Sequence, residues 1–466
     1  MRWPEAMTPV RMQRVAIVAP SAALREALLL VAEAGCTEVD RVEDALPGPA
    51  GRRLRRLHTA PAQPAALSDT PPDLDRLERE ARLDLLAGEA QLEERATSAV
   101  HRGEAAALAG WCPAGQVARL AEALAAIGGG LVPLRAPRGV DPPTLLRDGG
   151  PLRRAFSPLV RTYGTAPYRD LDPTWPAGIV YVVMFGLMFG DAGHGALLLM
   201  AALVLRTGRP RRLARLRPLW PFLAGAGLFS ALAGVAFGEF FGPTGVLPVL
   251  WLAPLDQPER LLAAAVALGG VLLALAHVAG VVNRWREGGP ARALSATSGV
   301  AGLALFLGLG AVGGGAYLRS PGLAAGGVAL LLAGLAMAGA GFFSATAGGA
   351  AGALQTAVEL FDAVLRAFAN TVSFSRLAAF GLTHAALGQV VWRGTAALAG
   401  RGSWALLGAA LLFAVGTALT FALEALVAGI QALRLEYYEL FSRVFQSLGR
   451  PFRPWHVPVR RTEVPR

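Results

Sequence analysis

Long apolar runs separated by short polar connectors occupy most of the chain after residue 175. Runs of this length can cross about 30 Å of hydrocarbon as helices. We therefore predict a mainly α-helical, polytopic membrane protein. The runs cover residues 176–206, 218–242, 260–283, 294–317, 322–345, 356–392 and 404–440.

The first apolar run is interrupted at its centre by polar residues and glycines, in the stretch MFGLMFGDAGHGALLLM at 184–200. Asp191 and His194 can satisfy backbone groups of a turn, and glycine permits a tight reversal of the chain. If the chain turns back at Gly190–Gly195, the protein has eight spans and Asp191 is structural. If the run is one kinked helix, there are seven spans.

The arginines of the connectors distinguish these two topologies, because cytoplasmic connectors carry an excess of positive charge. From a cytosolic N-terminus, seven spans place the basic connectors 206–217 and 284–292 and the tail from Arg450 outside. Eight spans place all three in the cytosol, and they place the connector 243–259, which has no arginine, outside. We therefore predict about eight transmembrane helices with both termini cytoplasmic, and the single kinked helix is the alternative.

The part of the chain before the apolar runs is polar and rich in arginine. Residues 14–20 are typical of a strand followed by a helix that closes near Gly35, and a second strand–helix pair follows Trp111. This pattern predicts a small α/β domain with a docking role, in which 41–73 is a linker. Leucines among charged residues over about 74–101 predict an exposed helical arm or short coiled coil. The predicted domains are cytosolic 1–172, transmembrane 173–445 and a cytosolic basic tail 446–466.

Composition removes several classes of function. The 466 residues carry a net charge of +11, and all of the basic residues are arginine. A chain without lysine cannot form a Walker A loop, so we expect no ATP hydrolysis by that route. The arginines cluster at membrane edges, where they act as topology signals, and we expect no nucleic-acid partner.

The two cysteines, Cys36 and Cys112, lack a metal-type spacing, and we expect no disulfide, metal or cofactor. No apolar leader with a small-residue cleavage site opens the chain, which is why we expect a cytosolic N-terminal part.

Placing an ionisable side chain inside an apolar span costs free energy, so each such residue is a candidate for a functional role. The last two runs contain five of them: Asp362, Arg376, His384, Glu424 and Arg434. On the eight-span topology Asp362 lies about 21 Å to the cytosolic side of Arg376, and His384 about 12 Å to its external side. In the final helix Glu424 lies about 15 Å to the external side of Arg434. Glu239 sits at an external span end and is expected to be an interfacial turn group.

This order suits a proton path that is interrupted at its centre. Carboxylates and an imidazole can take up and pass on protons, whereas guanidinium releases none at any useful pH. An arginine therefore blocks a direct leak and favours the ionised form of a carboxylate that comes opposite it. The alternative is that Arg376 only pairs with Asp362 or Glu424 in a structural role.

Several motifs resemble those of subunit a of the V-type and A-type ATPases, called subunit I in prokaryotes. They are MFGLMFGDAGHG, Gly238–Gly242 (GEFFG), Ser375–His384 (SRLAAFGLTH) and Ala432–Glu439 (ALRLEYYE), and in the polar part Gly110–Pro113 (GWCP), Asp141–Thr144 (DPPT) and Asp172–Thr174 (DPT). The match runs in the family's order over 105–455, which makes it specific.

The resemblance implies a stator subunit in the cell membrane. Its cytosolic domain would hold peripheral stalks of the E and G type and meet the central-stalk cap subunit of the d or C type. Two long, tilted final helices would face a rotating ring of proteolipids (c or K subunits) within the lipid bilayer. Arg376 would face the ring carboxylate and Arg434 would support it. Glu424 and His384 would line one half-channel and Asp362 the other. The short polar part departs from the family, because the paired-helix arm is reduced.

Two other functions fit the composition. A secondary transporter with an intramembrane charge network would be expected to show two similar halves with broken helices, and no such repeat is evident. A purely structural scaffold would not need five ionisable groups inside its spans.

Overall fold

The computed structural model describes residues 7–41, 47–57, 64–147, 149–209, 211–296, 298–445 and 449–460. These residues divide into two compact units. We call residues 9–147 together with 449–460 the sheet unit, and residues 149–445 with residues 7 and 8 the helical unit. The boundary between the units thus lies before the predicted division at residue 172, and residues 449–460, predicted to lie in a cytosolic basic tail, belong to the sheet unit.

The sheet unit contains the two predicted strand–helix pairs, and each continues into a further strand. The antiparallel sheet has the strand order β2-β5-β1-β6, with β4 beside β5. This is the βαββαβ arrangement of ferredoxin-like sheets. The first segment is β1 (Met12–Pro20), α1 (Leu24–Ala34) and β2 (Glu38–Val39); the second is β5 (Ala105–Pro113), α5 (Val117–Ala125) and β6 (Gly130–Pro133), preceded by β4 (Val100–Arg102).

The core of the sheet unit includes residues from the C-terminal segment. Val15, Ile17 and Ala19 alternate on the buried face of β1, as the two-residue period of a strand requires. Trp455 and Val457 join the same apolar cluster. Beyond them, β7 (Val459–Arg460) pairs in parallel with β3 (Leu67–Ser68). The expectation of a separate basic tail is therefore wrong for its described residues, because their apolar side chains complete a core.

The segment expected to form an exposed arm is instead packed against the sheet unit. It forms α3 (Leu74–Arg79) and α4 (Leu83–Thr97), and α2 (Pro49–Arg56) lies in the expected linker. Leu86 and Leu92 of α4 are buried. The acids of α4 bind within the unit: Glu89 pairs with Arg25, and the carboxylate of Glu93 accepts the backbone N–H of Ala50. Charge in this segment therefore indicates internal ion pairs rather than a solvated arm.

The helical unit confirms the mainly α prediction. Five of its helical segments, over 212–237, 258–291, 300–317, 321–345 and 404–444, are long and apolar enough to cross a bilayer. Two further apolar helices are shorter, and the total of eight spans stays a prediction. The helices are α6 (Pro151–Tyr163), α7 (Thr174–Met188), α8 (Ala192–Thr207), α9 (Trp220–Phe237), α10 (Pro258–Ser295, kinked at Gly289), α11 (Val300–Tyr317), α12 (Pro321–Ala345), α13 (Gly349–Ser373), α14 (Ser375–Ala399), α15 (Ser403–Leu435), a π-helix over Glu436–Phe441 and α16 (Ser442–Val444), with a 3₁₀ segment over Arg211–Leu219.

The predicted break in the first apolar run is observed, but the glycines act differently from expectation. Helix α7 ends at Met188 and α8 begins at Ala192. None of Gly190, Gly193 and Gly195 has a positive φ among the described residues. A Cβ at Gly190 would lie 2.7 Å from the Phe237 ring, and one at Gly195 would lie 2.4 Å from the backbone nitrogen of Ala231. The glycines are therefore needed for the close approach of α9 rather than for a left-handed turn.

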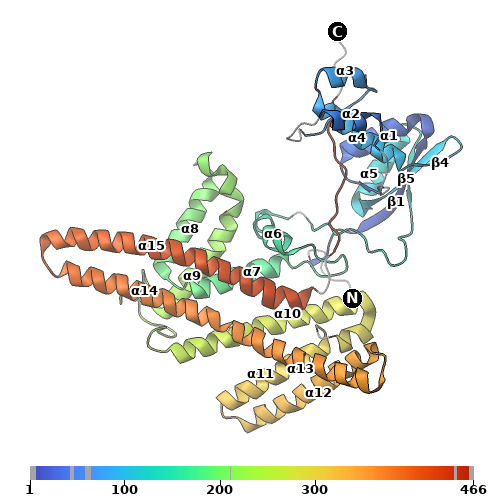
Figure 1. Cartoon of the computed structure of the whole chain (residues 1–466). Coiled ribbons are helices and arrows are strands. Elements are labelled where there is room, and N and C mark those ends of the chain that lie inside the picture. Colours follow the sequence, from blue (N-terminus) through green and yellow to red (C-terminus); the bar gives the residue numbers. More distant parts are fainter. Residues whose placement is uncertain are drawn as a thin grey trace. The chain divides into compact units, whose positions relative to one another are not determined.

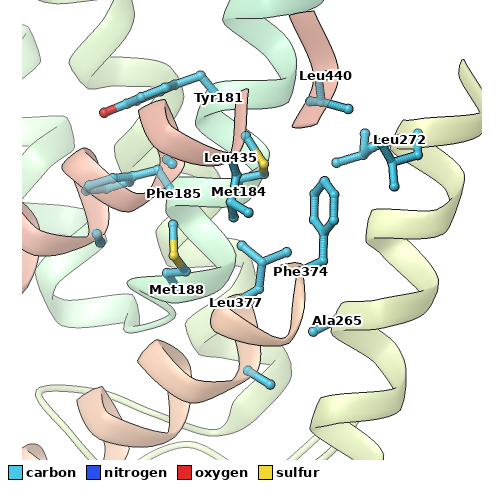
Figure 2. Packing of buried hydrophobic residues seen from close by; sticks show 14 of the residues in the cluster. Tyr181, Met184, Phe185, Met188, Ala265, Leu272, Phe374, Leu377, Leu435 and Leu440 are labelled. Carbon is cyan, nitrogen blue, oxygen red and sulfur yellow. The ribbon is translucent and has the colours of Figure 1, made fainter. Parts of the chain in front are cut away.

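The predicted run 356–392 also differs, because two helices occupy it. Helices α13 and α14 meet at Phe374, whose ring is buried against α10 beside Leu272 and Ala265 (Figure 2). A Cβ at Gly269 of α10 would lie 2.2 Å from this ring. The junction is thus held by an aromatic side chain seated over a glycine. Helices α14 and α15 then form a long antiparallel pair (Figure 1).

Candidate functional site

Five ionisable side chains from four segments meet inside the helical unit. We call them the buried polar cluster, and they are Asp191, His194, Glu239, His384 and Glu424. They come from the α7–α8 junction, the turn after α9, α14 and α15. The first four are at most 3% exposed as residues.

His384 is the centre of the cluster. Its Nδ1 is hydrogen-bonded to the carboxylate of Glu424. Its Nε2 lies 3.7 Å from Oδ2 of Asp191 and 3.8 Å from Oε2 of Glu239. One imidazole therefore connects three carboxylates, an arrangement that suits stepwise transfer of protons. The predicted proximity of His384 and Glu424 is confirmed.

Asp191 has the predicted turn role and a place in the cluster as well. Its carboxylate accepts the backbone N–H groups of His194 at 2.8 Å, Phe241 at 3.0 Å and Gly242 at 2.6 Å. These bonds cap α8 and attach its start to the turn after α9. Gly242 has φ +93°, and a Cβ there would lie 2.9 Å from the Cα of Gly388, so glycine is required.

Aromatic rings surround the imidazole of His194. The rings of Phe189, Phe241 and Phe421 lie 5.3 to 5.4 Å from it, centroid to centroid. Neither ring nitrogen of His194 has a hydrogen-bond partner among the described residues. The expectation that His194 satisfies turn backbone groups is therefore wrong for its side chain, which points into the cluster instead.

Glu239 was expected at the membrane interface, and the structure corrects this. The residue is 2% exposed and its carboxylate faces His384. The turn that contains it is bound to Asp191 and is thereby drawn against the α7–α8 junction. A tertiary hydrogen bond, which no spacing along the chain reveals, decides the burial of Glu239.

Arg376 has no ion-pair partner in the described part of the chain. It is half-buried near the start of α14, and its Nη1 is buried without a hydrogen-bond acceptor. Asp362 pairs instead with Arg366 at 2.5 Å, and Glu424 with His384. The alternative that Arg376 serves only as a structural partner of Asp362 or Glu424 is not supported.

Arg434 is exposed near the end of α15. Among the described residues it forms no ion pair, so the structure does not bring it together with Asp362 or with the buried polar cluster. Both arginines are thus available to groups outside this chain.

A second polar region lies beyond the α13–α14 junction. A cavity of about 360 Å³ is lined by residues of α10, α11, α12, α13 and the segment after α15. Ser373 donates to Glu439 at 2.5 Å beside this region. Asp362 adjoins the cavity through its partner Arg366. The polar lining residues are His277, Arg366, Asn370, Tyr438, Ser442 and Arg443.

The sequence argument assembled only part of this site. His384 and Glu424 were expected at one level, whereas Asp191, His194 and Glu239 were assigned to turns. The usable signal was that two neighbouring apolar runs both contain an acid beside glycines, GDAGHG and GEFFG. Small residues permit close backbone approach, and an acid at each break can then meet its counterpart.

Comparison with known proteins finds relatives of one kind, subunits I and a of V-type and A-type ATPases. A family model described as the V-type ATPase 116 kDa subunit family matches residues 97–216, which include Asp191 and His194. V-type ATP synthase subunit I 2 of Treponema pallidum is 34% identical over 146 residues, covering 29% of this chain and 32% of that protein. A-type ATP synthase subunit I of Aeropyrum pernix is 27% identical over 371 residues, covering 70% and 52%. V-type proton ATPase 116 kDa subunit a 3 of Homo sapiens is 33% identical over 155 residues, covering 30% and 19%.

The matched segments thus span between about a fifth and a half of these curated relatives. The family match includes the stretch GDAGHG, one of the motifs that the sequence shares with subunits a and I, and the chain has several membrane-type helices. The chain is thus similar to the V-type ATPase 116 kDa subunit family, whose model it matches over residues 97–216.

Proposed function

We propose that this chain is the membrane stator subunit of a rotary V/A-type ATPase. It provides two proton half-channels separated by Arg376, with Arg434 in support, against a ring of proteolipids. The buried polar cluster, with His384 and Glu424, forms the external half-channel. The cavity adjoining the Asp362–Arg366 pair forms the cytosolic one. The sheet unit anchors peripheral stalks and meets the central-stalk cap subunit.

The observation that carries this proposal is the unpaired state of Arg376. A charged side chain inside an apolar span is costly unless an opposite charge compensates it. Arg376 has no such partner among the described residues of its own chain, while the acids on either side of it are paired elsewhere. A carboxylate on a neighbouring subunit would supply the missing charge, and a ring that presents such carboxylates in turn would use Arg376 as a gate.

The exposure of α15 supports a partner in the membrane. Only 6% of its most apolar 18-residue window is buried, against 17% to 39% in the other four long helices. Exposed leucines, valine and isoleucine follow the helix. This face requires either lipid or a proteolipid subunit, and it lies on the helix that carries Glu424 and Arg434.

The sheet unit supports an even number of membrane crossings, as eight spans provide. The N-terminal strands and the C-terminal segment 449–460 fold into one unit with a shared core. An odd number of crossings would place these two parts on opposite sides of the membrane. The seven-span topology is therefore disfavoured, and both termini are proposed to be cytoplasmic.

Substitution of Arg376 tests the gate. In membrane vesicles that contain the complex, Arg376→Gln should abolish ATP-driven acidification, because the positive charge is lost. Arg376→Lys should reduce it by about tenfold or more, because lysine can release its proton in a site of low dielectric constant whereas arginine cannot. The measurement is the initial rate of fluorescence quenching of a pH-sensitive dye.

Arg393→Gln is the matched control, since Arg393 is an exposed arginine on the same helix. It should leave acidification near the wild-type rate. Co-purification of proteolipids and nucleotide-binding subunits should be unchanged in all variants. Acidification retained by Arg376→Gln, or transport by the chain purified without any partner, would refute the stator proposal in favour of a secondary transporter.

A further inference from the structure

The buried polar cluster has the composition and geometry of a transition-metal site. Ligand atoms of Asp191, His194 and His384 lie within 4.8 Å of one another, and all three residues are buried. We propose that these three residues, with Glu239 as a fourth ligand, bind a divalent ion of the Zn²⁺ class. The ligand set would thus combine two imidazoles with two carboxylates.

The distances are close to those that a tetrahedral ion requires. Zinc lies about 2.0–2.1 Å from its nitrogen and oxygen ligands, so neighbouring ligands stand roughly 3.3 Å apart. The separations here are 3.7 Å between His384 Nε2 and Asp191 Oδ2, 3.8 Å between His384 Nε2 and Glu239 Oε2, and 3.8 Å between His194 Nδ1 and Asp191 Oδ1. These three separations exceed the ideal value by roughly half an ångström, and the ligand atoms of Asp191, His194 and His384 all lie within 4.8 Å of one another, so side-chain adjustment would bring them onto one ion.

Unused nitrogen atoms point to a missing ligand. Both ring nitrogens of His194, and Nε2 of His384, are buried and have no hydrogen-bond partner among the described residues. Buried polar atoms are normally satisfied, and an unsatisfied one costs about 1–3 kcal/mol. A metal ion would satisfy the lone pair of each imidazole, and the two carboxylates would balance its double charge.

Hydrogen bonds already orient the ligands for this purpose. Glu424 binds Nδ1 of His384, which leaves Nε2 free to ligate, as in carboxylate–histidine–zinc arrangements. Three backbone N–H groups hold the Asp191 carboxylate in place. The site is therefore preorganised, which reduces the entropy lost on binding.

The ligand types select the kind of ion. Two imidazoles with carboxylates suit Zn²⁺ and its neighbours Co²⁺ and Ni²⁺, whereas Mg²⁺ and Ca²⁺ prefer six or more oxygen ligands. If the cluster is the external half-channel, as we propose above, a bound ion occupies the imidazole that protons must use. Zn²⁺ would then inhibit acidification from the external side. This consequence rests on the proposed function, whereas binding itself does not.

Metal binding is measured on the intact complex in detergent, first stripped with a chelator. We expect one additional equivalent of Zn²⁺, titrated against a chromophoric competitor, and visible absorption typical of tetrahedral Co²⁺ when cobalt replaces zinc. His194→Ala should remove that equivalent. Glu424→Gln should weaken it roughly 10- to 100-fold, as loss of an orienting carboxylate does.

His277→Ala is the matched control, because His277 is an equally buried histidine of α10 whose Nδ1 is bonded to the carbonyl of Leu273. It should retain the equivalent in full. Equal Zn²⁺ stoichiometry in the wild type and His194→Ala, or sulfur ligands in X-ray absorption, would overturn the metal site. A third outcome separates the two proposals. If His194→Ala loses the bound Zn²⁺, but Zn²⁺ does not inhibit acidification by the wild type, the metal site is established and the placement of the half-channel is wrong.

Discussion

Ionisable residues inside the apolar helices differ in the partners that their own chain gives them. His384 contacts three carboxylates, whereas Arg376 has no charged partner in the described residues. A charged side chain is costly to bury in either case. The carboxylates around His384 offset that cost within the subunit, whereas no described residue offsets it for Arg376. At the scale of a residue, Arg376 is the strongest indication that the chain works against another subunit.

The two cysteines lie together in the sheet unit, and both thiols are free. Antiparallel pairing of β2 with β5 brings the residues before Glu38 next to Cys112. The Cys112 thiol lowers the pKa of Cys36 to about 6, with help from Thr37 and Arg119 and against the effect of burial. Cys36 also lines a cavity of about 320 Å³.

Alkylation of Cys36 should therefore proceed at neutral pH. The thiolate is the reactive form, so its rate should rise with pH and reach half its maximum near pH 6. Cys112, whose pKa is raised by its bond to Cys36 and by burial, should stay unmodified in the folded chain. Peptide mapping after brief treatment with iodoacetamide measures both.

In Cys112→Ala the pKa of Cys36 should move back toward that of an ordinary thiol. Alkylation at pH 6.5 should then slow roughly tenfold or more. The denatured chain, in which both thiols react alike, is the control. A half-maximal rate above pH 8 in the wild type would contradict the thiol–thiol interaction.

At the scale of elements, the contact of α8 with α9 positions three of the five residues of the buried polar cluster. Gly195 faces the backbone of Ala231 and Gly227, and Gly234 faces the backbone of Ala192. Because these glycines have no side chains, the backbones of α8 and α9 lie close together. This brings the α7–α8 junction next to the turn that contains Glu239. The helices can pack this closely only because glycine occurs on both of them.

Gly195→Ala should therefore destabilise the helical unit by about 1–3 kcal/mol, the usual cost of overpacking. Its Cβ would meet backbone atoms, which cannot rotate away. The measurement is the thermal unfolding midpoint in detergent. Gly310→Ala on α11 is the control, because a Cβ there meets nothing within 4 Å.

The control should be neutral or stabilise by up to about 1 kcal/mol, since alanine favours the helix more than glycine does. Equal midpoints for the two variants would show that the α8–α9 approach tolerates a methyl group, and the packing argument would fail.

At the scale of the whole molecule, one folded unit joins the two ends of the described chain. Trp455 is buried in the sheet unit, donates to Gln91 at 3.1 Å and lies under the Arg95 guanidinium at 5.7 Å. The C-terminal segment thus contributes to the core of the sheet unit. The proposed topology, with an even number of membrane crossings, accounts for this shared unit.

Labelling of single cysteines tests the resulting topology. In a Cys36→Ser, Cys112→Ser background, Arg212→Cys should react with a membrane-impermeant maleimide from the cytosolic side. Val246→Cys, which is exposed in the connector after α9, should react only from the opposite side. Right-side-out and inverted vesicles provide the two measurements. The reverse pattern would restore the seven-span topology and exchange the sides of the two proposed half-channels.

Much of this architecture follows from the sequence alone. Apolar runs, arginine-rich connectors and alternating strands determined the mainly α membrane part, the two strand–helix pairs of the sheet unit and the break near Asp191. These features depend on local periodicity and on the free energy of transfer to hydrocarbon, both of which are properties of a short segment.

Only the tertiary structure decided which polar residues meet. Asp191 bonds to the turn after α9, Glu239 is thereby buried, and the acids of α4 find partners within the sheet unit. Each of these depends on backbone groups and side chains distant in sequence that come within hydrogen-bonding reach. A pattern along the chain contains the acids and glycines that make such contacts possible, but the position of the partner is set by packing.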